Sequence, residues 1–327
     1  MKTILITGGT GFIGSNLAAA LVAQGHHVKI FRRVNSPTSL IAHLKVEHCI
    51  GDVRDSASLR AALKNCDIVF HTAAIVSFWK PLRKLQYEVN VIGTKNIAHA
   101  CLEQGINRLV HTSSIAALGY PADGALADEE TAFNWHNLGG GYKSSKHLAE
   151  MEIEKAVNRG LDAVMVNPAV VIGPGDIHFN GGSIIRSVKK GFVPFYIKGG
   201  MNVVLVDDVV NAHIAAATKG STGERYIAGG ENLTHQQIFG ITAEIVGGRA
   251  PRYKLPVPLL KLAARGFDFA GALLHKEPLI SSELSSAAGL YNWYSSAKAQ
   301  RELGYQFTPF REAVTKTYQW YCKQGLL

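Results

Sequence analysis

The chain has 327 residues, of which 47% are hydrophobic and 18% charged, and its formal net charge is +9. This composition excludes a mainly disordered chain, and the length suits one large α/β domain with an appended lobe or two compact units. The basic residues are scattered, with only short doublets such as Arg32-Arg33 and Lys189-Lys190, so no nucleic-acid partner is expected. A solvated basic surface that favours an anionic cofactor or substrate explains the charge better.

Apolar runs of strand length alternate with amphipathic runs of helix length through the first half of the chain. Strands are expected at residues 3–7, 27–32, 46–50, 67–72, 108–113 and 162–168. Helices are expected at residues 12–25, 56–65, 85–105 and 142–160. Regular alternation of this kind predicts parallel strands with right-handed crossovers and helices on both faces, which is a doubly wound, Rossmann-type α/β sheet.

The alternation breaks after Pro168, where glycine-rich loops and shorter elements follow. We therefore expect a dinucleotide-binding Rossmann domain over residues 1–168. A smaller, mainly substrate-binding lobe is expected over residues 169–327, with some of its segments returning to the Rossmann domain.

One later segment, residues 257–274, is apolar enough to consider as a membrane-surface helix. Lys261, Arg265 and Asp268 interrupt it without forming one clean basic face. The pattern therefore favours a helix that packs within the lobe or faces a partner.

Directly after the first expected strand, residues 7–16 read TGGTGFIGSN and contain two overlapping glycine patterns. One is Gly9-x-Gly11-x-x-Gly14, the general dinucleotide pattern, and the other is Gly8-x-x-Gly11-x-x-Gly14. Glycines here let the backbone approach a pyrophosphate, while the first N–H groups of the following helix face its phosphates. The expected cofactor contacts are Gly8, Thr10, Gly11, Phe12, Ile13 and Gly14.

The ends of the next two strands bear on the type of cofactor. Arg32 and Arg33 stand where an acidic residue would accept hydrogen bonds from the ribose hydroxyls of NAD. A guanidinium can hold a 2'-phosphate, so NADP(H) is preferred and NAD(H) remains possible. After the third strand, Asp52 and Val53 lie where a carboxylate can accept from an adenine amino group, although the same short pattern also begins ordinary turns.

Tyr142 and Lys146 are four residues apart at the start of an expected helix, so both project from one face. An ammonium near a phenol favours the phenolate, and we expect it to lower the Tyr142 pKa from about 10 towards neutrality. A hydroxyl at the end of the fifth strand points into the crevice where such sheets bind ligands. Ser114, rather than Ser113, is expected to bind the substrate oxygen, and local capping is the alternative role.

These motifs, together with HTAA (71–74), NVIGTKNI (90–97), TSS (112–114) and NPAVVIGPGD (167–176), resemble the extended short-chain dehydrogenases/reductases in order and spacing. The resemblance favours the second glycine pattern and covers nearly the whole chain. It is strongest towards the dihydroflavonol 4-reductase-like branch, which includes hopanoid-associated sugar epimerase-like proteins.

The resemblance implies an NAD(P)-dependent redox step with a catalytic Ser114, Tyr142 and Lys146. Asn90 matches a position that supports the sheet near the site, and it is not expected to be catalytic. A homodimer formed through two long helices, residues 85–104 and 142–159, is a further implication. The implied cofactor contacts beyond the glycine loop are Asp52, Val53, Ala73, Ala74, Lys146, Pro168 and Val171.

Several residues are candidates for contact with substrate from their position alone, and packing is at least as good an explanation for each. Their mixture is aromatic and sparsely charged, and no arginine pair is placed to clamp a sugar diphosphate. An apolar carbonyl compound is therefore slightly favoured as substrate. The candidates are Ser77, Phe78, Trp135, His178, Asn180 and Tyr196.

The leading hypothesis is an NADPH-dependent ketone reductase that also acts as a secondary-alcohol dehydrogenase on a small molecule. A nucleotide-sugar epimerase or dehydratase that retains NAD is the alternative with the same site. A nucleotide-responsive binding protein is the alternative from another class, and it would have no need of the Ser, Tyr and Lys triad.

The compartment is expected to be the cytoplasm, because the amino terminus lacks the apolar region and cleavage site of a signal peptide. No apolar run reaches the length of a membrane span. The four cysteines are far apart and form no CxxC pair, so neither a disulfide framework nor a metal site is expected.

Overall fold

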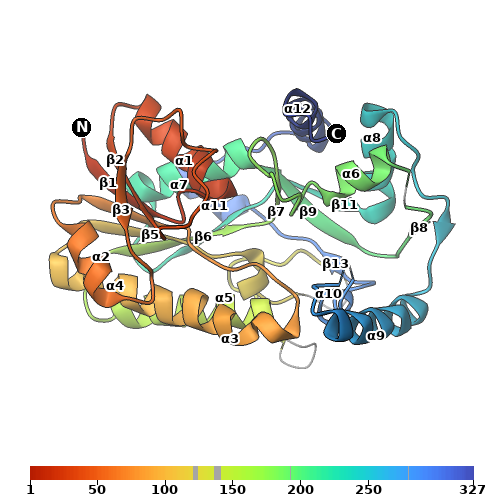
Figure 1. Ribbon diagram of the computed structural model, residues 1–327, viewed down its shortest axis with the longest axis horizontal. Helices are drawn as coiled ribbons and strands as arrows, with labels where there is room; N and C mark the ends of the chain where they lie inside the picture. Colours follow the sequence, from red (N-terminus) through yellow and green to blue (C-terminus); the bar gives the residue numbers. More distant parts are fainter. Residues whose placement is uncertain (121–123, 136–140, 192, 279) are drawn as a thin grey trace.

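The computed structural model describes residues 1–120, 124–135, 141–191, 193–278 and 280–327, and it is built around a seven-stranded sheet (Figure 1). The strand order is β10-β6-β5-β4-β1-β2-β3, and all neighbouring strands are parallel. The order reverses between β1 and β4, which is where such sheets bind ligands at the carboxyl ends of their strands. The strands are β1 (Thr3–Thr7), β2 (His27–Arg32), β3 (Glu47–Ile50), β4 (Ile68–His71), β5 (Arg108–Thr112), β6 (Ala163–Pro168) and β10 (Arg225–Ala228).

Helices cover both faces of this sheet, because its strands alternate apolar side chains between two cores. In β1, Ile4 and Ile6 enter one core and Leu5 enters the other. The first core is closed by α1 (Phe12–Ala23), α7 (Val206–Lys219) and α11 (Ala297–Leu303). The second is closed by α2 (Ser56–Leu63), α4 (Gly93–Gln104) and α5 (Gly141–Val157).

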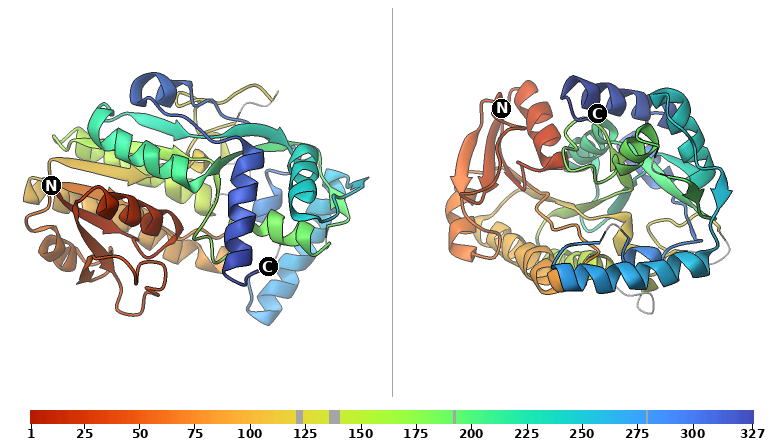
Figure 2. Two further views of the ribbon diagram at one scale, coloured as in Figure 1. Left: turned by 90° about the horizontal axis from the view of Figure 1, so that it is seen from above. Right: turned by 45° about the vertical axis from the view of Figure 1, so that its right-hand side comes forward.

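The smaller lobe contains a second sheet of order β11-β9-β13, with β7 also paired to β9, and a separate two-stranded ladder of β8 and β12 (Figure 2). Its core lies between this second sheet and the helices α6, α8 and α12. The lobe strands are β7 (Val170–Ile172), β8 (Phe195–Tyr196), β9 (Gly200–Leu205), β11 (Glu231–Thr234), β12 (Tyr253–Lys254) and β13 (Tyr291–Asn292). The lobe helices are α6 (Ser183–Lys189), α8 (His235–Val246), α9 (Val257–Leu274), α10 (Ser282–Ser285) and α12 (Phe310–Lys323).

The Rossmann-type fold expected from the alternation is confirmed, and the six expected strands match the observed ones to within one residue at each end. The first six strands of the main sheet end at Pro168. The second half of the chain adds the strand β10 to this sheet, and its helices α7 and α11 pack against one face. The helices α4 and α5 pack against each other beneath the sheet, and their role in a dimer stays a prediction.

The expected helix over residues 85–105 has a different internal structure. It consists of α3 (Arg83–Gln86), a π-helical segment (Tyr87–Ile92) and α4, preceded by one 3-10 turn (Lys80–Leu82). A π-helical turn fits one more residue than an α-helical turn, and such turns are frequent at functional sites. The apolar periodicity of the sequence does not indicate where a π-helical turn occurs.

The helix expected over residues 257–274 is present as α9. Of the two surroundings expected for it, packing within the lobe is wrong for most of its surface, and contact with a partner stays a prediction. Only Ala264 and Gly271 are buried along its 18 residues. The segment has too few neighbours to cover its apolar side chains, so periodicity indicated the helix without indicating its surroundings. None of the helices in the described ranges is both long and apolar enough to cross a membrane.

Candidate active site

The glycine loop joins β1 to α1 at the point where the sheet order reverses. Gly8 has φ +70°, and a Cβ at this position would lie 2.6 Å from the backbone nitrogen of Ala73. A Cβ on Gly14 would lie 2.8 Å from the Cα of Gly9 and collide with the Gly8 carbonyl oxygen. Only glycine therefore lets β1, α1 and the segment after β4 approach so closely.

The amino terminus of α1 is open towards this loop. Its N-cap is Gly11, which has no side chain to accept from the first N–H groups, and its first turn contains no acidic residue. The N–H groups of Phe12 and Ile13 thus have no capping side chain among the residues described, and the helix dipole adds partial positive charge. This is the geometry in which a helix binds a phosphate.

Arg32 and Arg33 follow at the end of β2. The Arg32 guanidinium donates to His48 Nδ1 (3.1 Å) and to the carbonyl oxygens of Arg33 and Val34 (both 3.2 Å). In the part of the chain that the structure describes, neither arginine is paired with a carboxylate. Their positive charge is therefore available to an anion beside the loop.

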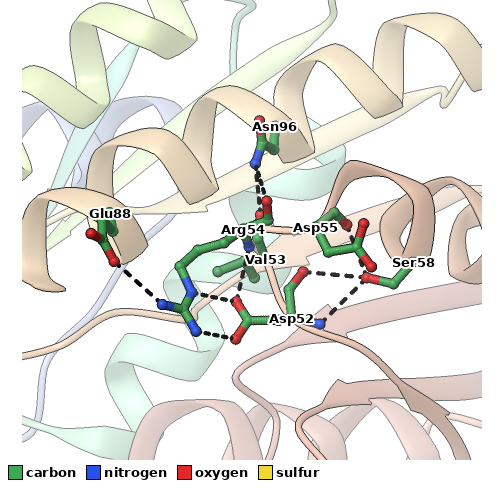
Figure 3. A network of polar contacts seen from close by, with 7 residues as sticks. All are labelled: Asp52, Val53, Arg54, Asp55, Ser58, Glu88 and Asn96. Atoms are coloured by element: carbon green, nitrogen blue, oxygen red, sulfur yellow. Dashed lines mark hydrogen bonds and ion pairs between the residues drawn. The ribbon is translucent and has the colours of Figure 1, made fainter.

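Asp52 is engaged in a surface network, which Figure 3 shows. Arg54 donates to it from Nε (3.0 Å) and Nη2 (2.8 Å), and it also contacts Glu88 at 3.3 Å. The Arg54 guanidinium holds the Asp52 pKa below its usual value. Val53 is buried, and its carbonyl oxygen accepts from Asn96 at 3.1 Å. Most of the hydrogen-bonding capacity of Asp52 is thus already used within the protein.

Ser114, Tyr142 and Lys146 converge at the carboxyl end of β5. The Lys146 ammonium is almost fully buried and donates to the carbonyl oxygen of Thr112 at 2.8 Å. The Ser114 side chain hydrogen-bonds the Tyr142 phenol and also accepts from the backbone nitrogen of Ala116 at 3.1 Å. Ser114 therefore caps a short 3-10 turn (Ile115–Ala117) and faces Tyr142 at the same time. Ser113 is buried and its hydroxyl lies against Glu150 instead.

The pKa values in this site depart from the expectation for Tyr142. Burial of its hydroxyl raises the Tyr142 pKa to about 12, and the hydrogen bond to Ser114 offsets only part of that rise. The expected fall towards neutrality is wrong for the protein alone, since desolvation of the phenolate outweighs its hydrogen bond. Burial also lowers the Lys146 pKa to about 8, against the opposing attraction of Glu150.

Two buried histidines hold the strand ends around Lys146. His213 Nδ1 lies 2.7 Å from the Val209 carbonyl oxygen, which can only accept, so Nε2 accepts from the Thr112 hydroxyl at 2.7 Å. His71 bridges the hydroxyls of Thr7 and Thr94 at 2.7 and 3.0 Å. Burial lowers the pKa to about 3 for His71 and about 4 for His213, so both are neutral near pH 7.

Asn90, in the π-helical segment, ties the loop after β4 to the helix of the triad. Its side chain exchanges two hydrogen bonds with the backbone of Ile75, at 2.8 and 3.0 Å, and donates to the Ser145 hydroxyl at 2.9 Å. Asn90 thereby joins these two segments, and its place outside the catalytic residues stays a prediction.

Glu283 is a site residue that the sequence did not reveal. Its buried carboxylate accepts from the Tyr142 backbone nitrogen at 3.1 Å and pairs with Arg83 at 2.8 Å. It thereby joins the lobe to the first turn of α5. A single glutamate in a serine-rich stretch, more than 140 residues from its partner, gives no pattern from which this contact could be inferred.

The comparisons decide the family. The sequence profile described as "NAD dependent epimerase/dehydratase family" matches residues 4–229, more than half of the chain. The chain belongs to this family. A protein named "Putative dihydroflavonol 4-reductase" from Synechocystis sp. is 35% identical over 325 residues, covering 98% of this chain and 94% of that protein. "Sterol demethylase protein B" from Methylococcus capsulatus is 33% identical, with coverage of 99% and 100%.

A solved structure is similar over the complete chain. The crystal structure of gox2253 has a TM-score of 0.88 and 36% sequence identity, and each chain covers the other fully. The expected membership of the extended short-chain dehydrogenases/reductases and the expected class, an NAD(P)-dependent oxidoreductase acting on CH–OH or C=O groups, are confirmed.

A nicotinamide dinucleotide of the kind used by this family fits the residues present. The backbone cradle at Gly8 and Gly14 would be filled by any Cβ, and the open amino terminus of α1 suits a pyrophosphate. Ala73 adjoins that cradle, and Ala73 and Ala74 are both partly buried. Pro168 ends β6, and Val171 lies in β7.

The six positional candidates for substrate contact lie in different surroundings. Phe78 is the one in contact with the triad, with its ring edge-on to Tyr142 at a centroid distance of 5.7 Å. Ser77 is buried and donates to Glu277, and Trp135 is buried and donates to the Leu118 carbonyl oxygen. The other three make no contact with the triad among the described residues: His178 and Asn180 are exposed, and Tyr196 lies in β8.

Lys143, next to Tyr142, is a buried cation whose charge affects the stability of the protein. Its Nζ lies 3.4 Å from the centroid of the Trp135 ring, and burial lowers its pKa to about 8. The unfolded chain keeps this proton to about pH 10.5. Between about pH 8 and 10.5 the unfolded state therefore binds more protons, and the free energy of unfolding of the wild type rises with pH.

Replacing Lys143 by Met removes the cost of burying this charge. We expect the free energy of unfolding at pH 7 to rise by about 1–3 kcal/mol, and the advantage over wild type to shrink as pH approaches 10.5. Urea unfolding at pH 7 and pH 10 measures both. Lys155→Met, at an exposed lysine of α5, is the matched control and should change stability by less than about 0.5 kcal/mol. A Lys143→Met variant that is less stable at pH 7 would show that the contact with Trp135 outweighs desolvation.

Proposed function

We propose that this protein is an NADPH-dependent ketone reductase that also oxidises the corresponding secondary alcohol of a small apolar molecule. The observation that carries the proposal is the convergence of Ser114, Tyr142 and Lys146 at the carboxyl end of β5. A protein that only binds a nucleotide has no use for a phenol, a hydroxyl and an ammonium arranged in this way. The cofactor, when bound, supplies the hydride for the carbonyl carbon.

The residues of the triad have separate roles in this proposal. Tyr142 donates its proton to the carbonyl oxygen as the alcohol forms, and in the reverse direction it takes the proton back. Ser114 orients that oxygen by a hydrogen bond, since its side chain already meets the Tyr142 hydroxyl. Lys146 places a positive charge beneath the site, which favours the phenolate left after proton donation, and Thr112 fixes its position.

The proposed preference for NADPH rests on Arg32. This arginine lies at the end of β2, and no carboxylate pairs with it within the described ranges. A 2'-phosphate beside it would gain charge-assisted hydrogen bonds of about 1.5–3 kcal/mol. NADH has no such phosphate and gains nothing from the arginine.

Replacing Arg32 by Asp should therefore separate the two cofactors. We expect the Kd for NADPH to rise by about 10- to 100-fold while the Kd for NADH changes by less than about threefold. Calorimetric titration of the purified protein measures both constants. Arg60→Asp, at an exposed arginine of α2 paired with Glu103, is the matched control and should leave both constants unchanged. Equal losses for the two cofactors would remove the argument for NADPH.

An apolar substrate is supported by the surroundings of Tyr142. The Phe78 ring packs edge-on against the phenol. Of the cations around the site, Arg83 pairs with Glu283, and Lys146 donates to the Thr112 carbonyl oxygen. Neither is free to clamp a diphosphate.

The alternative is an epimerase that keeps its cofactor, and it is favoured by the epimerase/dehydratase description of the family. Acid release and identification of any nucleotide that copurifies distinguishes the two. Loosely held NADP(H), and turnover of apolar ketones with NADPH, is the result we expect. Tightly retained NAD together with activity on nucleotide sugars would place the epimerase reaction first.

A further inference from the structure

The helix α9 presents an uncovered apolar face at the edge of the lobe. In Figure 1 and in the right-hand view of Figure 2 it runs along the outer border of the molecule. Its buried positions, Ala264 and Gly271, are seven residues apart and so lie on one side of the helix. The exposed fractions of its large apolar side chains are 55% for Leu259, 65% for Leu262, 45% for Phe267, 74% for Phe269, 72% for Leu273 and 65% for Leu274.

Four of these side chains, Leu259, Leu262, Phe269 and Leu273, lie on the side of the helix opposite to the buried positions, whereas Phe267 and Leu274 flank the buried side. At 100° per residue, Leu262, Phe269 and Leu273 fall within about 40° of one another, roughly 140–180° from Ala264. The positions beside them are Leu259, Ala263, Gly266 and Ala270, which are also exposed and carry no charge. A contiguous exposed surface of leucine and phenylalanine is unusual in a protein without a partner for it.

Positive charge borders this apolar face on three sides. Lys261 and Arg265 lie one turn apart along one edge of α9, and Lys276 follows its carboxyl end. Arg252 and Lys254 precede its amino end. These five side chains are exposed and have no ion pair or side-chain hydrogen bond among the described residues. Of the two carboxylates in the segment 252–277, Asp268 accepts from the Ser282 backbone and Glu277 accepts from Ser77.

We propose that α9 and its basic flanks, residues 252–276, form a docking surface for an anionic lipid bilayer. Leucine and phenylalanine side chains of α9 enter the boundary between headgroups and acyl chains, while the cations along its edge and at its ends meet the lipid phosphates. The exposed ring of Tyr253, which contacts that of Phe195 at a centroid distance of 6.3 Å, extends the surface beyond the amino end of the helix.

The charges favour a lipid surface over a second copy of this chain. In a symmetric dimer through α9, the two apolar faces would meet and bring the cations of both copies together without carboxylates between them. An anionic bilayer satisfies the apolar face and the cations at once.

The carboxyl end of α9 is linked to the segment beside Tyr142. Glu277, three residues beyond α9, accepts from Ser77 at 2.7 Å, and Ser77 adjoins Phe78 beside Tyr142. The adjacent Val76 is 54% exposed. The docking itself is independent of the reaction proposed above, because it uses none of the residues of the triad or the glycine loop.

Vesicle flotation with the full-length protein tests the proposal. We expect the wild type to float with vesicles of phosphatidylcholine containing about 40% phosphatidylglycerol, and to bind pure phosphatidylcholine vesicles at least tenfold more weakly. The triple variant Leu262→Gln, Phe269→Gln, Leu273→Gln should lose at least tenfold in binding to the anionic vesicles. The variant Lys261→Gln, Arg265→Gln, Lys276→Gln should bind them several-fold more weakly and lose most of the salt dependence.

The matched control is Leu126→Gln, at a leucine that is 56% exposed far from α9 in the chain, and it should bind as the wild type does. Circular dichroism verifies that each variant is folded, and sedimentation velocity without lipid reports self-association. No flotation with anionic vesicles at millimolar lipid overturns the proposal. A wild-type dimer that the apolar triple variant converts to a monomer also overturns it and assigns the face to a second copy.

Discussion

Replacing Tyr142 by Phe is expected to lower kcat for ketone reduction by about a thousandfold or more while the Kd of NADPH changes by less than about threefold. The substitution removes only the hydroxyl that gives its proton to the substrate in the proposed reaction, and general acids contribute about 10²–10⁴ in rate. The ring stays in contact with Phe78, so the packing of the site is kept. Stopped-flow reduction and calorimetric titration measure the two quantities.

The control for this substitution is Tyr318→Phe on α12, which removes an equivalent hydroxyl outside the site and should retain wild-type turnover. Turnover retained by Tyr142→Phe would mean that another acid supplies the proton. If NADPH binding and turnover were both lost, the hydroxyl would be needed to position the cofactor rather than to transfer a proton.

Replacing Gly14 by Ala is expected to raise the Kd of NADPH at least 30-fold and to lower the free energy of unfolding by about 1–3 kcal/mol. The added Cβ would collide with the Gly8 carbonyl oxygen and lie 2.8 Å from the Cα of Gly9. Both are backbone atoms, which cannot turn aside, so α1 must move away from the glycine loop. The N–H groups at its amino terminus would then leave the place that suits a pyrophosphate.

Gly240→Ala in α8 is the matched control for this prediction, because it also adds a Cβ to a helical glycine. No atom lies within 4 Å of that added Cβ, so the variant should bind NADPH normally and gain up to about 1 kcal/mol in stability. Calorimetric titration measures the Kd of NADPH for both variants, and urea unfolding measures their free energies of unfolding. NADPH binding by Gly14→Ala within threefold of wild type would place the pyrophosphate elsewhere.

The triad is stabilised by contacts from distant parts of the chain. Lys146 is oriented by Thr112, whose hydroxyl is fixed in turn by the neutral His213. The Tyr142 backbone is held by Glu283 of the lobe. The Glu283 contact crosses the boundary between sheet and lobe, so the relative position of the two affects the geometry of the site.

The sequence alone predicted the parallel sheet, which the structure confirms, as well as the glycine loop and the residues proposed as the triad. Each of these depends on local information: strand and helix periods differ, a glycine pattern follows a strand directly, and a spacing of four residues fixes two side chains on one helix face. The same kind of local information placed Arg32 at the end of β2, with no acidic residue beside it in the sequence.

Only the tertiary structure decided which groups surround those residues. Desolvation, which raises the pKa of Tyr142, depends on atoms that fold around the hydroxyl from distant segments. The contact of Glu283 with Tyr142 joins residues 141 positions apart, and no periodicity records it. The amphipathic pattern of α9 predicted a helix, but whether its apolar face is covered depends on what packs there, and in this fold the lobe leaves that face open.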